Sequence, residues 1–201
     1  MEENIKTFTG KLFLKDEHIK TLKFTGTSSD RVITVFMESI FIRAEEKDFR
    51  EECTFTISPE GYIRVQINFN GNGKESSLRL RKIGENKVEI YRNSVLKEII
   101  ETEKSEKFLL DGLNPIFDFY NYMFFVSSED GVKLEKDVYS IEHQEGELIK
   151  KKYIFEKKDN EVCINKGESG EVLLELWEES YDLKKIKTKD TVFFLIDENR
   201  P

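Results

Sequence analysis

The chain has 201 residues, a length that allows one large β domain or two small ones with a substantial buried core. It carries 32 basic and 40 acidic residues, and this net charge of −8 repels phosphate backbones unless the basic residues gather on one face. Because the basic residues are scattered along the sequence, we expect no nucleic-acid binding. No run approaches the ~18 apolar residues of a transmembrane helix, so we expect no membrane-spanning segment.

The first half of the chain has the pattern of consecutive antiparallel strands. Apolar residues recur at every second position, and polar turns interrupt them at hairpin spacing. The clearest strand is 63–69, in which Arg64, Gln66 and Asn68 form a polar face opposite an apolar one. Asn70-Gly71-Asn72-Gly73 follows it and predicts a tight hairpin, because these residues tolerate positive φ.

The second half resumes this strand pattern after the middle of the chain and continues it to Ile196. Residues 94–110 fit both a helical period and a strand, and we favour a strand there. No repeat and no low-complexity linker separates the two halves. We therefore expect both halves to share one sheet in a single domain, 1–201.

The middle of the chain contains one strongly apolar segment. Nine of the eleven side chains of Ile116–Val126 are large and apolar or aromatic. Asn114 is a competent N-cap and a proline follows it, so the sequence predicts a helix over 115–126. Asp118 and Asn121 are the only polar residues inside this helix. A helix that is apolar almost all round is buried on most sides.

These elements predict a mainly β fold. An antiparallel sheet of about ten strands tends to curl, and its concave side must then be filled. We expect an antiparallel β-barrel, open or closed, or a half-barrel, with one central hydrophobic helix. Small barrels of this kind can hold apolar ligands.

The segment Leu110-Asp111-Gly112-Leu113-Asn114-Pro115 leads into this aromatic helix, with meandering strands on both sides. This layout resembles the bacterial envelope proteins of the DUF3108 group and, more loosely, the open barrels of LolA and LolB. The resemblance implies a periplasmic protein whose concave face takes an acyl chain or another hydrophobic partner. The acidic N-terminus lacks a secretory signal, so the alternatives are a cytoplasmic protein and one whose signal has been removed.

The sequence predicts a non-enzymatic protein that binds a hydrophobic small molecule or a lipid beside the helix. Aromatic residues and methionine suit adaptable apolar sites, while the two polar residues could place a polar group at the entrance. The alternative is an interaction protein with a filled core, which binds another protein through its sheet edges or loops. The residues expected to contact the ligand are Phe117, Asp118, Tyr120, Asn121, Met123 and Phe124.

No pattern in the sequence indicates catalysis, and we predict no cofactor, metal or catalytic residue. The two histidines, His18 and His143, sit in charged, turn-like settings, which favour surface positions over metal binding. Cys53 and Cys163 each lie in a strand pattern beside apolar residues, so buried inert thiols are favoured. In an oxidising compartment the alternative is a disulfide between them.

Overall fold

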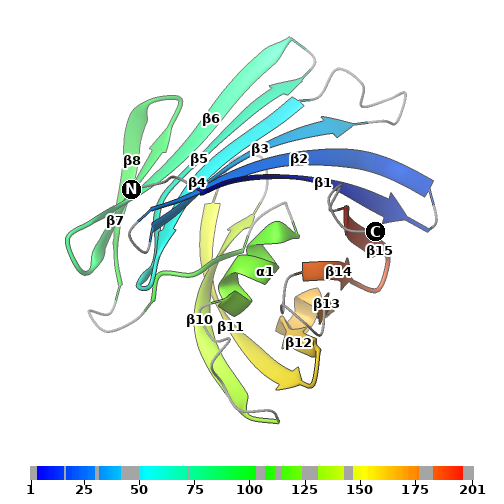
Figure 1. Cartoon of the computed structure of the whole chain (residues 1–201). Helices are drawn as coiled ribbons and strands as arrows, with labels where there is room; N and C mark the ends of the chain where they lie inside the picture. Colours follow the sequence, from blue (N-terminus) through cyan, green and yellow to red (C-terminus); the bar gives the residue numbers. More distant parts are fainter. Residues whose placement is uncertain are drawn as a thin grey trace. The chain divides into compact units, whose positions relative to one another are not determined.

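The computed structural model describes residues 4–15, 17–29, 32–41, 50–71, 73–102, 107–111, 115–123, 131–142, 147–176 and 183–196. Within these ranges the chain is mainly β, with one short α-helix and one 3-10 helix (Figure 1). The elements are β1 (Asn4–Leu14), β2 (Glu17–Ser29), β3 (Val32–Phe41), β4 (Arg50–Ser58), β5 (Gly61–Gly71), β6 (Lys74–Ile83), β7 (Lys87–Arg92), β8 (Val95–Glu101), β9 (Leu110–Asp111), α1 (Ile116–Met123), β10 (Lys133–Glu142), β11 (Glu147–Lys158), β12 (Glu161–Asn165), η2 (Gly167–Ser169), β13 (Glu171–Leu176), β14 (Leu183–Lys187) and β15 (Thr191–Ile196).

The described strands form one sheet that is not closed into a barrel. Its hydrogen-bonded order is β8-β7-β6-β5-β4-β3-β2-β1-β15-β14-β13-β12-β11-β10-β9, so β8 and β9 are its ends. The pairs from β2 to β8 and from β10 to β15 are antiparallel, whereas β9 runs parallel to β10.

The chain divides into two compact units. Unit 1 contains the described residues of 1–10 and 19–108, and unit 2 those of 11–18 and 109–196. The single domain predicted from the sequence stays a prediction.

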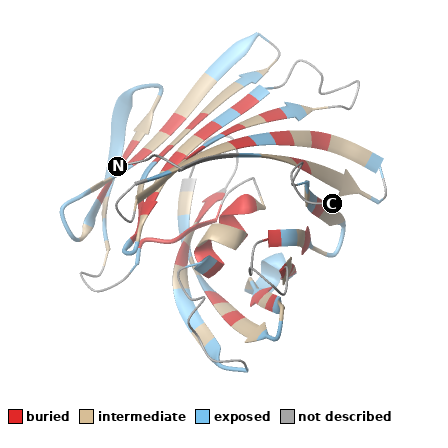
Figure 2. Ribbon diagram, viewed as in Figure 1, coloured by how far each residue is buried: buried red, intermediate tan, exposed pale blue. Residues whose placement is uncertain are grey.

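Unit 1 buries one face of its strands because the strand register aligns the apolar residues. Val35, Phe55, Val65, Leu80 and Ile90 are successive cross-strand partners from β3 to β7, and all five are buried. Figure 2 shows buried residues alternating with more exposed ones along these strands. A strand period of two therefore turns the alternate residues of the same strands to the other face. This face is mostly polar on β4, β5 and β6, whereas β3 exposes Phe36 and Ile40 on it.

Unit 2 also buries one face of its strands through cross-strand pairs of apolar residues, and it contains the helix α1. Val162, Leu174, Ile186 and Phe193 pair across β12 to β15, and all four are buried. Helix α1 belongs to this unit and buries Phe117. The predicted apolar helix is therefore confirmed over Ile116–Met123, while Asn114 and residues 124–126 lie outside the described residues.

The predicted strand in 94–110 and the hairpin after residue 69 are confirmed by β8 and by the β5–β6 turn. The predicted number of about ten strands is wrong, because the described residues form 15. The sequence pattern missed β14, Leu183–Lys187, whose two apolar residues are outnumbered by three lysines. It also missed β9, since a two-residue strand is too short to give a period.

Candidate functional site

The residues predicted to contact a ligand fall into three classes of exposure. Phe117, Asp118 and Asn121 are buried, and Phe124 lies outside the described residues. Tyr120 is half-buried, and this burial raises the pKa of its hydroxyl to about 12. Met123 is 39% exposed. Among the described members of the set, Tyr120 and Met123 are therefore the ones that a ligand could reach.

Asp118 belongs to a buried charge cluster in unit 2 that the sequence did not predict. Lys166 Nζ lies 2.6 Å from Asp118 Oδ1 and 3.0 Å from Asp111 Oδ1. The Tyr153 hydroxyl donates a 2.5 Å hydrogen bond to Asp111 Oδ2. Because these side chains come from β9, α1, β11 and the turn after β12, the cluster joins four segments of the unit.

The electrostatics of this cluster follow from burying two carboxylates beside one ammonium. Desolvation raises the pKa of Asp118 to about 7, and Asp111 adds to this rise, although Lys166 opposes it. Burial works against the charge on Lys166, but the two carboxylates keep its pKa above the usual value. Burial and Asp111 likewise raise the pKa of Tyr153. One proton on Asp118 makes the group of Lys166 and the two aspartates neutral, which lowers the cost of burying it.

Asn121 ties the helix to β9 beside this cluster. Its Nδ2 donates a 2.7 Å hydrogen bond to the Leu110 carbonyl, which links the side chain of the helix to the short strand. The side chains of Lys166, Asp111 and Asp118 are only 9, 12 and 4% exposed. This burial indicates that the cluster has a structural role in unit 2, where it connects segments that are distant in sequence.

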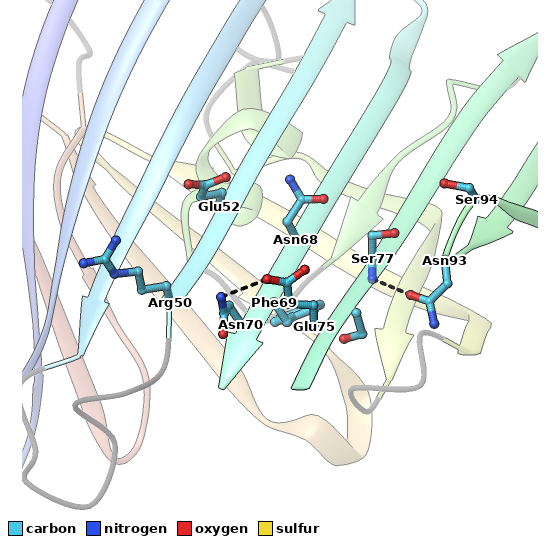
Figure 3. Close-up of a pocket in the computed structure, with 10 residues that line it drawn as sticks. Arg50, Glu52, Asn68, Phe69, Asn70, Glu75, Ser77, Asn93 and Ser94 are labelled. Carbon is cyan, nitrogen blue, oxygen red and sulfur yellow. Dashed lines mark hydrogen bonds between the residues drawn. The ribbon is translucent and has the colours of Figure 1, made fainter. Parts of the chain in front are cut away.

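A groove in unit 1 is more accessible. It has a volume of about 610 Å³ and lies over one end of β4, β5 and β6 and the turn after β7 (Figure 3). Its lining residues are Arg50, Glu52, Asn68, Phe69, Asn70, Glu75, Ser76, Ser77, Asn93 and Ser94. All but Phe69 are polar, so this groove suits a ligand that forms hydrogen bonds.

The register of the strands explains why these side chains gather. Glu52, Asn68 and Ser77 are cross-strand partners and form one row on the polar face of β4 to β6. Asn70 and Glu75 belong to the next row, and the Asn70 amide donates a 3.4 Å hydrogen bond to Glu75. The alternation seen in the sequence of β5 identified Asn68 as polar-facing. Its partners needed the register, which no single strand reveals.

A turn residue completes the groove. Asn93 adopts a positive φ of 47°, and its Oδ1 accepts a 2.9 Å hydrogen bond from the backbone N–H of Ser77. This bond fixes the side chain of Asn93 against β6 and leaves its amide group available at the groove. The turn between β7 and β8 is therefore anchored where it lines the groove (Figure 3).

Both cysteines are free thiols, but the predicted burial holds only for Cys53, because Cys163 is partly exposed. Burial, assisted by Glu51, raises the pKa of the buried Cys53, and burial also raises that of Cys163, to about 11.

His18 is half-buried and stacks on Phe13 at a centroid distance of 5.1 Å, while His143 lies outside the described residues. In the described part of the chain, no three His, Cys, Asp or Glu side chains are grouped as metal ligands. Nor does that part contain a helix with the length and apolar character to cross a membrane.

The fold is similar to two solved structures of unassigned function. One is a DUF1089 family protein from Pseudomonas aeruginosa, with a TM-score of 0.56, 9% identity and coverage of 81% of this chain and 86% of that one. The other is a β-barrel-like protein of the domain of unknown function DUF1849 from Brucella abortus, with a TM-score of 0.53, 7% identity and coverage of 97% and 96%. No family model and no curated protein matches the sequence. The likeness supports a β-barrel-like fold, whereas the resemblance to the DUF3108 group and LolA stays a prediction.

Proposed function

We propose that this chain is a non-enzymatic binding protein whose ligand occupies the groove over β4, β5 and β6. The observation that carries the proposal is the convergence of amide, hydroxyl, carboxylate and guanidinium groups around about 610 Å³. Sites for small molecules commonly enclose roughly 300 to 1,000 Å³. The side chains of Arg50 and Glu52 form no hydrogen bond or ion pair with another described residue, so both can bind a ligand.

The chemistry of the groove favours a polyhydroxylated ligand such as a small sugar. Sugar hydroxyls can donate to the carboxylates of Glu52 and Glu75 and accept from Arg50 and the amide of Asn93. An apolar ligand would desolvate these groups without pairing them, at about 1 to 3 kcal/mol for each buried group. The groove therefore selects against the hydrophobic ligand expected from the sequence.

Two-dimensional ¹⁵N NMR with a panel of mono- and disaccharides tests this proposal. A ligand of the groove should shift the amide signals of residues 50–52, 68–70, 75–77 and 93–94. Asn68→Ala should weaken that binding about tenfold, because it removes a central hydrogen-bonding amide. Thr54→Ala, on the same face of β4 but outside the groove lining, should leave the affinity unchanged. Absence of localised shifts with every sugar would contradict the proposal.

Shelter of a hydrophobic ligand, such as an acyl chain in a bacterial envelope, is a second candidate. The 39% exposure of Met123, an apolar side chain at the C-terminal end of α1, favours it. Displacement of a fluorescent fatty acid measures this binding directly. Met123→Lys should weaken it, while Ile149→Lys, at a site in the same unit that is 40% exposed, should not. Equal effects of the two substitutions would rule out a specific site at Met123.

The interaction alternative is favoured by the edge strand β8. Val95, Leu96 and Ile99 are 55, 45 and 52% exposed at one end of the sheet. Antiparallel pairing with a second copy about the Lys97–Glu98 bond places these two charges opposite each other and Leu96 opposite Ile99. This candidate ranks lower because β8 contains a register shift beside β7, and such bulges commonly blunt sheet edges.

Light scattering coupled to size-exclusion chromatography tests this pairing. The wild type should elute as a dimer. Leu96→Lys should make the protein monomeric, because it places a charge opposite Ile99 of the second copy. Ile83→Lys, at a site 39% exposed on β6, serves as the control. A monomeric wild type at high concentration removes this candidate.

A further inference from the structure

The arginines of this chain are unevenly placed. The chain uses lysine for most of its positive charge, since only eight of its 32 basic residues are arginines. Three of these arginines, Arg64, Arg79 and Arg81, lie on the neighbouring strands β5 and β6. Arginine differs from lysine in its planar fork of donors, which matches oxyanions and stacks on aromatic rings. The placement of three arginines on these two strands therefore provides oriented hydrogen-bond donors as well as positive charge.

The strand register brings the three guanidinium groups to one face. Arg64 is directly opposite Arg81, and Arg79 is opposite Gln66 in the next row. This is the polar face that also carries Asn68 and the groove, because residues two apart on a strand share a face. Like charges directly opposite each other destabilise a sheet. Arg64 and Arg81 thus form an unfavourable pair unless an anion lies between or beside them.

The described chain supplies one carboxylate for these three groups. Glu89 Oε2 accepts hydrogen bonds from Arg81 at 2.9 and 2.6 Å and from the Tyr91 hydroxyl at 2.7 Å. The Arg79 guanidinium stacks over the Tyr91 ring at 4.1 Å, which fixes its plane without neutralising it. Arg64 is exposed, and its side chain has no hydrogen bond or ion pair with another described residue. The three guanidinium groups therefore share one carboxylate, that of Glu89, and this local group carries an excess of two positive charges.

We propose that Arg64, Arg79 and Arg81 form a binding subsite for an oxyanion, such as a phosphate, sulfate or carboxylate group carried by a polar ligand. The free fork of Arg64 and the aromatic-stacked Arg79 provide the donors, while Glu89 orients Arg81. As a subsite it rests on the proposed function, since the ligand's neutral part would occupy the groove. The carboxylates of Glu52 and Glu75 line that groove, so the anionic end belongs at the arginines.

The test separates the subsite from the groove by its choice of probes. ¹⁵N NMR titration with inorganic phosphate alone, at constant ionic strength, should shift the signals of β5 and β6 around the three arginines. Glucose should act only at the groove, and glucose 6-phosphate should act at both places with higher affinity than either. Binding of phosphate without glucose contradicts the groove and leaves the oxyanion subsite standing. Binding of glucose without phosphate overturns the subsite alone.

Matched variants distinguish a site from general charge attraction. Arg64→Gln should weaken phosphate binding about tenfold, and Arg64→Lys should fall between it and the wild type, since it keeps the charge and loses the fork. Lys23→Gln removes the same charge from an exposed position on β2 in unit 1, and it should have no effect. Equal losses from Arg64→Gln and Lys23→Gln would overturn the subsite, as would phosphate shifts spread over the whole chain.

Discussion

Lys166 and Asp118 form a buried ion pair in which Nζ and Oδ1 are 2.6 Å apart. The pair joins the turn after β12 to the helix α1, and Asp111 of β9 shares the same ammonium group at 3.0 Å. Two acids and one base in a site of low polarity cannot all be charged without cost. The protonation of Asp118 is therefore coupled to the stability of unit 2.

The pKa of Asp118, raised from 3.8 to about 7, makes the stability depend on pH with a defined sign. In the folded state the carboxyl holds its proton up to about pH 7, whereas the unfolded chain loses it near pH 4. The contribution of Asp118 to the free energy of unfolding is therefore fully present below the pKa of the unfolded state. It is lost as the pH rises through the pKa of the folded state. Asp118→Asn mimics the protonated form and does not titrate. The free energy of unfolding of this variant, relative to that of the wild type, should therefore rise by about 2 to 4 kcal/mol between pH ~4 and ~7.

Urea unfolding of both proteins across this pH range measures that difference. Comparing the two proteins removes the contributions of the other carboxyl groups, which titrate in both. A difference in unfolding free energy that stays constant with pH would show that Asp118 is ionised in the folded protein.

Removing the shared ammonium should be much more damaging than removing an exposed one. Lys166→Met leaves Asp111 and Asp118 buried without a cation, and breaking a buried ion pair costs about 3 to 5 kcal/mol. Lys152→Met removes a cation of the same unit from its exposed pair with Glu135, and it should have no measurable effect. Thermal and urea unfolding measure both variants. Comparable losses of stability in the two variants would mean that the buried ion pairs of Lys166 contribute no more than the exposed pair of Lys152.

The sequence was most informative where alternation alone decides the structure. The polar face predicted for Arg64, Gln66 and Asn68 is the face that carries the groove and the proposed oxyanion subsite. The basic residues look scattered in sequence, yet Arg64 and Arg81 become neighbours because β5 and β6 form a hairpin in a fixed register. Clustering of this kind depends on pairing between strands, and the pattern of one strand does not contain it.

Polar residues that point inward were the ones that sequence patterns missed. Lys166 follows a strand and precedes a glycine turn, a typical surface setting, but it pairs with Asp111, 55 residues away. Glu51 is likewise part of a charged doublet, and it is buried in a 3.2 Å ion pair with Lys20. A charge tolerates burial when a partner arrives from elsewhere in the fold. Composition and period do not reveal such a partner.

The two thiols should differ in reactivity. Cys53 is fully buried and burial raises its pKa, whereas Cys163 is partly exposed and has a pKa raised to about 11. Since the thiolate is the reactive form, a disulfide reagent near neutral pH should label Cys163 slowly and Cys53 only after unfolding. A Cys163→Ser variant isolates the signal of Cys53. Absence of free thiol in denaturant without reductant would instead support the disulfide alternative.

The contact between Gly61 and Phe108 predicts a strong requirement for glycine. Gly61 has φ of +106°, and a Cβ there would lie 2.4 Å from the Phe108 carbonyl oxygen. The Tyr62 N–H donates to the same oxygen at 2.8 Å, so Phe108 cannot withdraw without losing a buried hydrogen bond. Gly61→Ala should destabilise the protein by at least about 3 kcal/mol, since strain and loss of that bond add. Gly73→Ala, at φ +69° in open space, should cost about 1 kcal/mol and calibrates the effect of positive φ alone. Urea unfolding compares the two variants, and equal losses would show that the chain after β8 does not press against Gly61 in solution.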